Sequence, residues 1–243
     1  MKRWFLLTLL LSFVFTAQAR AEVGLESIAM TMADYLIAGR IVIAENQPLI
    51  NNPAKGNKKF TPQVYAEQVR MAFMKESGLE IKNLTPSDDF NKALIAIHES
   101  AKDVIAEAQP QINEPGKGFK GFIPAIFGRQ VGDKFFKKTG IIVKQTSLKY
   151  RADYNKPDDF EVAVLKKFES AKMGSTYDEQ TTFGDTKVLR FMSPLYIEKP
   201  CLPCHGEPAG EKDITGRIKE GYKEMDLRGA ISVIVPIKCV LGN

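Results

Sequence analysis

The chain has 243 residues, with 34 Lys or Arg and 29 Asp or Glu, so its formal charge is +5. Hydrophobic residues make up 44% and charged residues 26%, a balance that allows a sizeable core and excludes wholesale disorder. No stretch beyond the amino terminus approaches the length of a membrane span, which excludes a polytopic membrane protein. Three cysteines are too few for a disulfide scaffold of this size.

Residues 1–21 have the pattern of a cleaved secretory signal peptide. Lys2 and Arg3 precede a mostly apolar run over 4–15, and small residues lead up to Ala21. The run is short for a bilayer span, so we expect cleavage rather than an uncleaved anchor, and a periplasmic protein without a membrane span. Cleavage removes three basic residues and no acidic one, which lowers the charge to +2 and gives no support for nucleic-acid binding.

A tandem repeat follows, with an offset of 62 residues and no gap. The segment 47–62 recurs at 109–124, and the residues on both sides keep the same register. Each copy predicts a long helix, over about 25–46 and about 88–108, that ends at Gln-Pro. A loop follows, and then a second helix that begins at proline and ends at glycine. We expect a helical unit over 22–86, and a second copy over 87–147 that leads into the next domain.

The pattern changes from helical to mixed after Gly140. The segments 141–146 and 229–237 are rich in β-branched residues, and residues 158–171 have a helical pattern with acidic residues in the first turn. Shorter strand-like segments lie at 181–183 and 187–194. Antiparallel strands with one or two helices predict an α+β fold for a domain over 87–243.

Cys201-Leu-Pro-Cys204-His205 is the most informative motif in the chain. C-x-x-C-H is the attachment signature of c-type haem, in which two thiols bind the two vinyl groups of one porphyrin. The histidine that follows is then held beneath the iron as an axial ligand. The motif therefore predicts one covalent haem c, bound by Cys201 and Cys204, with His205 as a metal ligand.

Three other interpretations of the motif are weaker. A thioredoxin-like pair needs a βαβ setting, which the preceding sequence does not provide. A zinc site needs a second pair of ligands, and only His98 and Cys239 remain. A disulfide between Cys201 and Cys204 would not require His205.

The second axial ligand of the iron is open at the sequence level. His98 is the other histidine, near the apolar face of its helix, and the equivalent residue in the first copy is Leu36. His98 is thus a candidate metal ligand, although it could also be a helix residue without a role. Cys239, a methionine (Met173, Met192 or Met225) or an open site are the alternatives. Arg129, Arg151 and Arg190 are candidate partners of the haem propionates, because guanidinium groups match carboxylates in geometry.

Several sequence blocks resemble a family of mono-haem c proteins with a PAS-like fold, found alone in the periplasm or as sensory modules of bacterial chemoreceptors and kinases. The blocks cover about residues 88–237 and are Phe122–Arg129, Lys144–Ser147, Arg151, Asn155–Asp158, Phe160–Glu161, Cys201–Gly206 and Gly229–Val233. The resemblance implies a PAS-like antiparallel sheet with flanking helices and a covalent haem at Cys201 and Cys204, with His205 as axial ligand.

The resemblance also implies that a helix before the sheet supplies the opposite ligand, which is a cysteine in at least some members. Neither long helix of this chain contains cysteine, so His98 could replace it or the site could be open. The first helical unit is a further departure from the family pattern.

These features predict an exported mono-haem c protein for one-electron transfer or redox sensing, with a redox partner protein. The alternative is a sensor of redox state or of a small diatomic ligand, acting through a partner. We do not expect a haem enzyme such as a peroxidase, because one spare histidine cannot serve both as an axial ligand and as a distal base.

Overall fold

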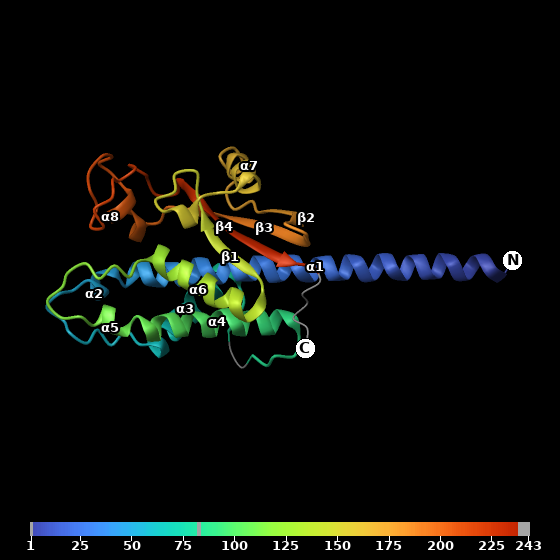
Figure 1. The fold of residues 1–243 in the computed structure, drawn as a ribbon, viewed down its shortest axis with the longest axis horizontal. Coiled ribbons are helices and arrows are strands. Elements are labelled where there is room, and N and C mark those ends of the chain that lie inside the picture. The colour runs from blue at the N-terminus through green and yellow to red at the C-terminus, as the bar shows by residue number, and fades with distance from the viewer. Residues whose placement is uncertain (1, 82–83, 238–243) are drawn as a thin grey trace.

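The computed structural model describes residues 2–81 and 84–237, and it describes side chains from residue 24 onward. Its helices are α1 (Lys2–Glu45), α2 (Gln47–Ile50), α3 (Pro62–Ser77), α4 (Asp89–Glu107), α5 (Gln109–Ile112), α6 (Pro124–Thr139), α7 (Asp159–Phe168) and α8 (Leu202–His205), with 3-10 turns η1 (Asp153–Asn155) and η2 (Lys199–Cys201). Its strands are β1 (Ile142–Thr146), β2 (Tyr177–Phe183), β3 (Thr186–Tyr196) and β4 (Leu227–Pro236) (Figure 1).

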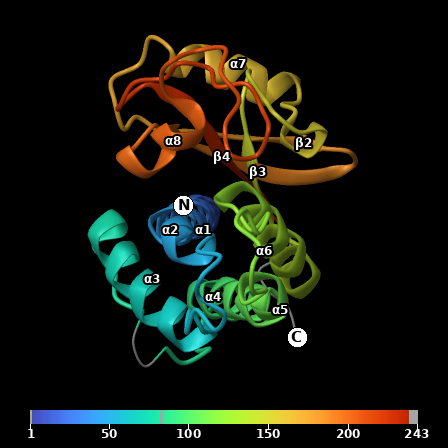
Figure 2. The same cartoon turned by 90° about the vertical axis from the view of Figure 1, so that its left-hand side faces the viewer.

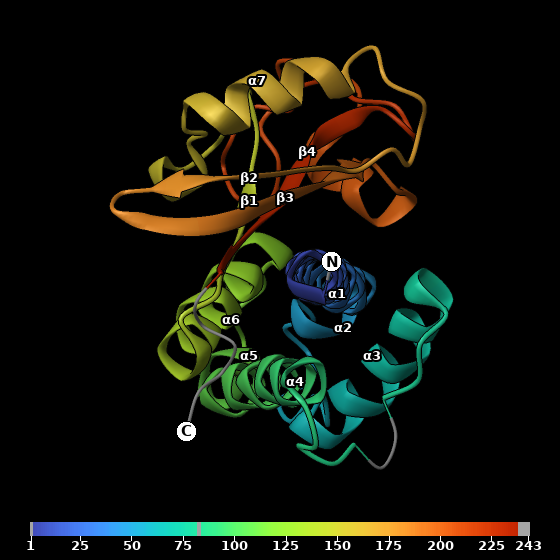
Figure 3. The same ribbon diagram turned by 90° about the vertical axis from the view of Figure 1, so that its right-hand side faces the viewer.

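A four-stranded antiparallel sheet in the order β1-β4-β3-β2 lies between two helical layers. Helix α7 covers one face, and a layer of α1, α3, α4 and α6 covers the other, with α1 and α6 in contact with the strands (Figure 3). The predicted α+β class is therefore confirmed. The boundary at residue 86 between two predicted domains stays a prediction, although α1 packs directly against β3 and β4.

The alternation of side chains along the strands accounts for the layers. Phe191 and Val233 point to the layer of α1, α3, α4 and α6 and belong to the large core, whereas Met192 and Ala230 pack with α7. Because successive strand residues face opposite sides, one apolar strand contributes to both cores. Both faces of β3 and β4 are buried as a result.

The two repeat copies form equivalent helix pairs that are joined by reciprocal hydrogen bonds. Gln47 Nε2 donates to the Phe122 carbonyl oxygen over 2.9 Å, and the equivalent Gln109 Nε2 donates to the Phe60 carbonyl oxygen over 2.9 Å. The backbone amides of two buried lysines also donate to asparagines of the other copy, Lys58 to Asn113 and Lys120 to Asn51. Each loop thus folds against the opposite copy, at the end of the layer where α2 and α5 lie (Figure 2).

The predicted helix limits are confirmed with two corrections. The first long helix, predicted from about residue 25, begins at Lys2 in the structure. Asp88 caps α4, and Gly78 and Gly140 end α3 and α6 in the left-handed conformation. The Gln-Pro pairs, however, begin the short helices α2 and α5 rather than irregular loops. Proline is compatible with the first turn of a helix, because the amide hydrogen that it lacks would have no helical partner there.

The predicted signal peptide lies in the part of α1 for which the structure describes the helix but not the side chains. An apolar amino-terminal helix is compatible with a signal sequence. The segment Gly24–Glu45 is long and apolar enough to cross a membrane by length and composition, but 72% of its most apolar window is buried within the protein. A core helix has the same properties.

Asp34 on α1 is expected to make stability dependent on pH. Burial, together with repulsion from Glu76, raises the pKa of Asp34 from 3.8 to about 6. The folded state therefore holds the proton more tightly than the unfolded state, and stability falls as pH rises between these two values. Asp34→Asn should raise the unfolding free energy at about pH 8 by about 1 kcal/mol, allowing for solvent screening, with less effect at about pH 4. Urea unfolding at both pH values measures this; an equal effect at both would contradict it.

Candidate functional site

A cavity of about 420 Å³ lies where the sheet meets the helical layer. Its walls come from α1, the start of α6, the ends of β1 and β3, the start of β4, and the η2–α8 segment. Most of the exposed wall is apolar, and the volume lies within the range of small-molecule and cofactor sites. The cavity therefore joins segments from both repeat copies and from the carboxy-terminal part of the chain.

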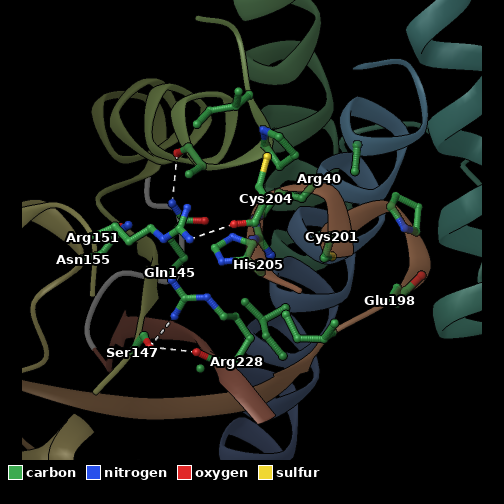
Figure 4. Close-up of a pocket in the computed structure, with 18 of the residues that line it drawn as sticks. Arg40, Gln145, Ser147, Arg151, Asn155, Glu198, Cys201, Cys204, His205 and Arg228 are labelled. Carbon is green, nitrogen blue, oxygen red and sulfur yellow. Dashed lines mark hydrogen bonds between the residues drawn. The ribbon is translucent and has the colours of Figure 1, made fainter. Parts of the chain in front are cut away.

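The C-x-x-C-H motif places all three of its functional side chains on this cavity. Cys201 ends η2, and Cys204 and His205 lie on α8, one helical turn further on. All three line the cavity and are half-buried, and both cysteines are free thiols (Figure 4). The turn thus brings together the groups that the sequence predicts to act together.

His205 is held in a neutral form with a defined orientation. Its Nδ1 lies 2.9 Å from Glu220 Oε2, so Nδ1 carries the hydrogen and donates it, and Nε2 keeps a lone pair. Burial, assisted by Arg228, lowers the pKa of His205 to about 4, against the opposing effect of the Glu220 hydrogen bond. A neutral imidazole fixed by a carboxylate is the form in which histidine coordinates metals.

The Cys204 side chain is held in its protonated thiol form. Burial raises the pKa of Cys204, and the nearby Asp213 carboxylate acts in the same direction. The thioredoxin-like interpretation is disfavoured by the order of the elements, because the motif follows strand β3 of an antiparallel sheet and not a strand of a βαβ unit.

Arg151 stabilises the position of the motif through ion pairs and a hydrogen bond. Its guanidinium pairs with Asp213 over 2.6 Å and with Glu220 over 2.6 Å, and it donates to the Cys204 carbonyl oxygen over 2.8 Å (Figure 4). Arg151 lines the cavity as predicted, but these bonds occupy it. It therefore positions Glu220 and α8, and its predicted role as a propionate partner stays a prediction.

Two predicted residues lie outside the cavity. His98 is on α4, where its Nδ1 lies 2.9 Å from the buried Tyr35 hydroxyl, and it is not among the described residues that line the cavity. The expectation that it faces the haem is not supported, because α1, and not α4, forms that wall. Arg129 stacks over Tyr154 at 5.0 Å and pairs weakly with Asp133, also outside the cavity. Cys239 lies outside the described residues.

The remaining candidates divide between cavity and core. Met225 lies on a loop and lines the cavity, and its backbone amide donates to the Ile197 carbonyl oxygen. Met192 is buried near α7, and Met173 is exposed. Arg190 pairs with acidic residues around α7.

Three residues of the site, of which Arg40 and Arg228 line the cavity, could not be assigned from the sequence patterns alone. Glu220 and Arg228 come from loop and strand segments that carry no motif, and only the fold brings them to His205. Arg40 lies on α1 with its side chain at the cavity, near Cys201 and Cys204 (Figure 4). A single charged residue within the apolar segment 36–44 was the signal that could have identified it.

The residues at the cavity fit a covalently bound haem. Two thiols separated by two residues, a neutral imidazole directly after them, and apolar walls are the donor set that such a group needs. Buried Arg40 Nε also lacks a hydrogen-bond partner among the described residues, which indicates that the cavity is built to hold a polar or charged group.

Comparisons with known proteins place the chain in a family. A model of the Tll0287-like family matches residues 17–236. Among solved structures, the cyanobacterial heme-protein Tll0287 is similar, with 23% identity and a TM-score of 0.40, over 60% of this chain and 91% of that chain. No curated protein matches. Because the family model spans most of its length, the chain belongs to the Tll0287-like family.

Proposed function

We propose that the chain is an exported, periplasmic mono-haem c protein in which Cys201 and Cys204 bind one haem covalently and His205 is an axial ligand. The observation that carries this proposal is the convergence of both thiols and a neutral imidazole on one cavity. The family takes its name from a protein described as a heme-protein, which supports the haem-binding part of the proposal.

We propose one-electron transfer or redox sensing as its activity. Bound haem supplies an iron that changes oxidation state by one electron, at a potential set by its ligands and its surroundings. Glu220 fixes the His205 ring and Arg151 fixes Glu220, so the imidazole is held in one orientation. The mostly apolar walls lower the local dielectric, which affects the potential. A partner protein would deliver or accept the electron.

A sensor of small ligands is a second candidate, because of the composition of the α1 wall. The described α1 residues at the cavity are Ile37, Arg40, Ile41 and Ala44. None has an atom that usually coordinates haem iron. If α1 provides no second axial ligand, an external small ligand could bind the iron instead.

Optical and EPR spectra of the purified protein, with and without carbon monoxide, test the proposal and separate its two forms. A haem spectrum is expected in both cases. Low-spin iron that does not bind carbon monoxide would support electron transfer, whereas high-spin iron that binds it readily would support sensing. A purified protein without haem absorbance would contradict both.

A further inference from the structure

We propose that Arg40 forms a binding site for a small inorganic anion at the α1 wall of the cavity. This inference rests on the proposed function, because the anion would bind beside the haem. It goes further by assigning the class of external ligand and the residue that selects it.

Arg40 differs from the other arginines around the cavity in its lack of partners. Arg151 pairs with Asp213 and Glu220, and Arg228 donates to Ser147 over 2.6 Å. Within the described part of the chain, Arg40 forms no hydrogen bond and no ion pair, and its Nε is shielded from solvent. Arg40 is half-buried, and its Nε lacks the hydrogen-bond partner that buried polar atoms normally have.

Arg40 stays positively charged in its surroundings. Burial lowers the pKa of Arg40 to about 10, so the group stays protonated at neutral pH. Glu198 is close enough to act on it electrostatically, but the two form no ion pair. Gln145 is also near Arg40, because both side chains lie beside Gly128. A Cβ atom placed on Gly128 would be 3.3 Å from Arg40 Cδ and 3.6 Å from Gln145 Oε1. Gln145 Nε2 donates to Ala125, and its Oε1 makes no bond to Arg40.

The position of Arg40 favours an external anion over a haem propionate. Propionates are charged and are best placed at the open rim, where the exposed Arg217 lines the cavity. Arg40 instead lies on a wall whose other described α1 residues are apolar, and these residues offer no iron ligand. A small anion that coordinates the iron would meet the unpaired guanidinium there, and a charge-assisted hydrogen bond would stabilise it.

Azide titration of the ferric protein carrying its haem, followed by optical absorption, tests this inference. Arg40→Leu is expected to weaken azide binding about tenfold or more, and Arg40→Lys less, since it keeps the charge but loses the planar donor geometry. Arg129→Leu is the matched control, because it removes one positive charge outside the cavity, and its dissociation constant should stay within about twofold of wild type. Carbon monoxide, which is neutral, should bind the ferrous wild-type and Arg40→Leu proteins with similar affinity.

Several results would overturn the inference. Equal azide affinity in wild type and Arg40→Leu would do so. Absence of azide binding to the wild-type iron, because a side chain such as Met225 coordinates it, would do so too. A shift of the reduction potential in Arg40→Leu without a change in azide binding would make Arg40 a propionate partner instead. Haem content and circular dichroism show whether the variants fold, and Arg40→Lys serves if the leucine variant does not. A wild-type protein without covalent haem would refute the proposed function itself.

Discussion

Replacing both Cys201 and Cys204 by serine is expected to abolish retention of haem after denaturation. Each thiol forms one of the two covalent links, and His205 alone cannot hold the group once the fold is lost. Expression in cells that mature c-type cytochromes, followed by denaturing electrophoresis and haem staining, measures this. The double variant should give no stained band at the size of the protein.

The single variants make this prediction more specific. Cys201→Ser or Cys204→Ser should leave at most one thioether, so the reduced pyridine complex of the haem should absorb at longer wavelength because one vinyl group stays conjugated. Cys239→Ser is the matched control, since it also replaces a thiol but lies outside the motif and should keep the wild-type spectrum. Full staining of the double variant would show that the links lie elsewhere.

Gly132→Ala is expected to destabilise the protein by roughly 2–3 kcal/mol. Gly132 lies on α6 where the helix contacts β1, and a Cβ atom there would overlap the backbone carbonyl oxygen of Val143. Backbone cannot move aside as a flexible side chain can, so α6 would have to separate from the sheet. The cavity would also be affected, because both elements line it.

Urea unfolding measures this effect, with Gly118→Ala as the matched control. A Cβ atom at Gly118 would meet no atom within 4 Å, and no positive backbone angle requires glycine there. The control should therefore change the unfolding free energy by less than about 0.5 kcal/mol. Equal stability of Gly132→Ala and wild type would mean that α6 does not approach β1 this closely.

Local features of the fold could be predicted from the sequence because they depend on nearby residues. Proline and glycine fix the limits of α3 and α6, and the repeat register anticipates that Gln47 and Gln109 take equivalent positions. The edge strand β2 was predicted too short, since Asp178, Glu179 and Gln180 carry no apolar pattern. Their strand conformation comes from pairing with β3, which a local pattern cannot report.

The site was predictable only where its residues are adjacent in the sequence. The motif at 201–205 carries its own geometry, whereas Glu220 and Arg228 depend on tertiary contacts. The sequence favours His98 because it is the other histidine and lies near the apolar face of its helix. The fold instead places α1 of the first copy against the cavity, so the wall residue is Arg40. Duplication made the two long helices equivalent in sequence but not in position.

The mass of the intact wild-type protein, measured after denaturation, tests the central claim most directly. Protein from cells that mature c-type cytochromes should exceed the mass of its processed polypeptide by that of one haem. A mass equal to the polypeptide alone, from cells that load haem onto a known c-type cytochrome in parallel, would contradict the claim that Cys201 and Cys204 bind haem covalently.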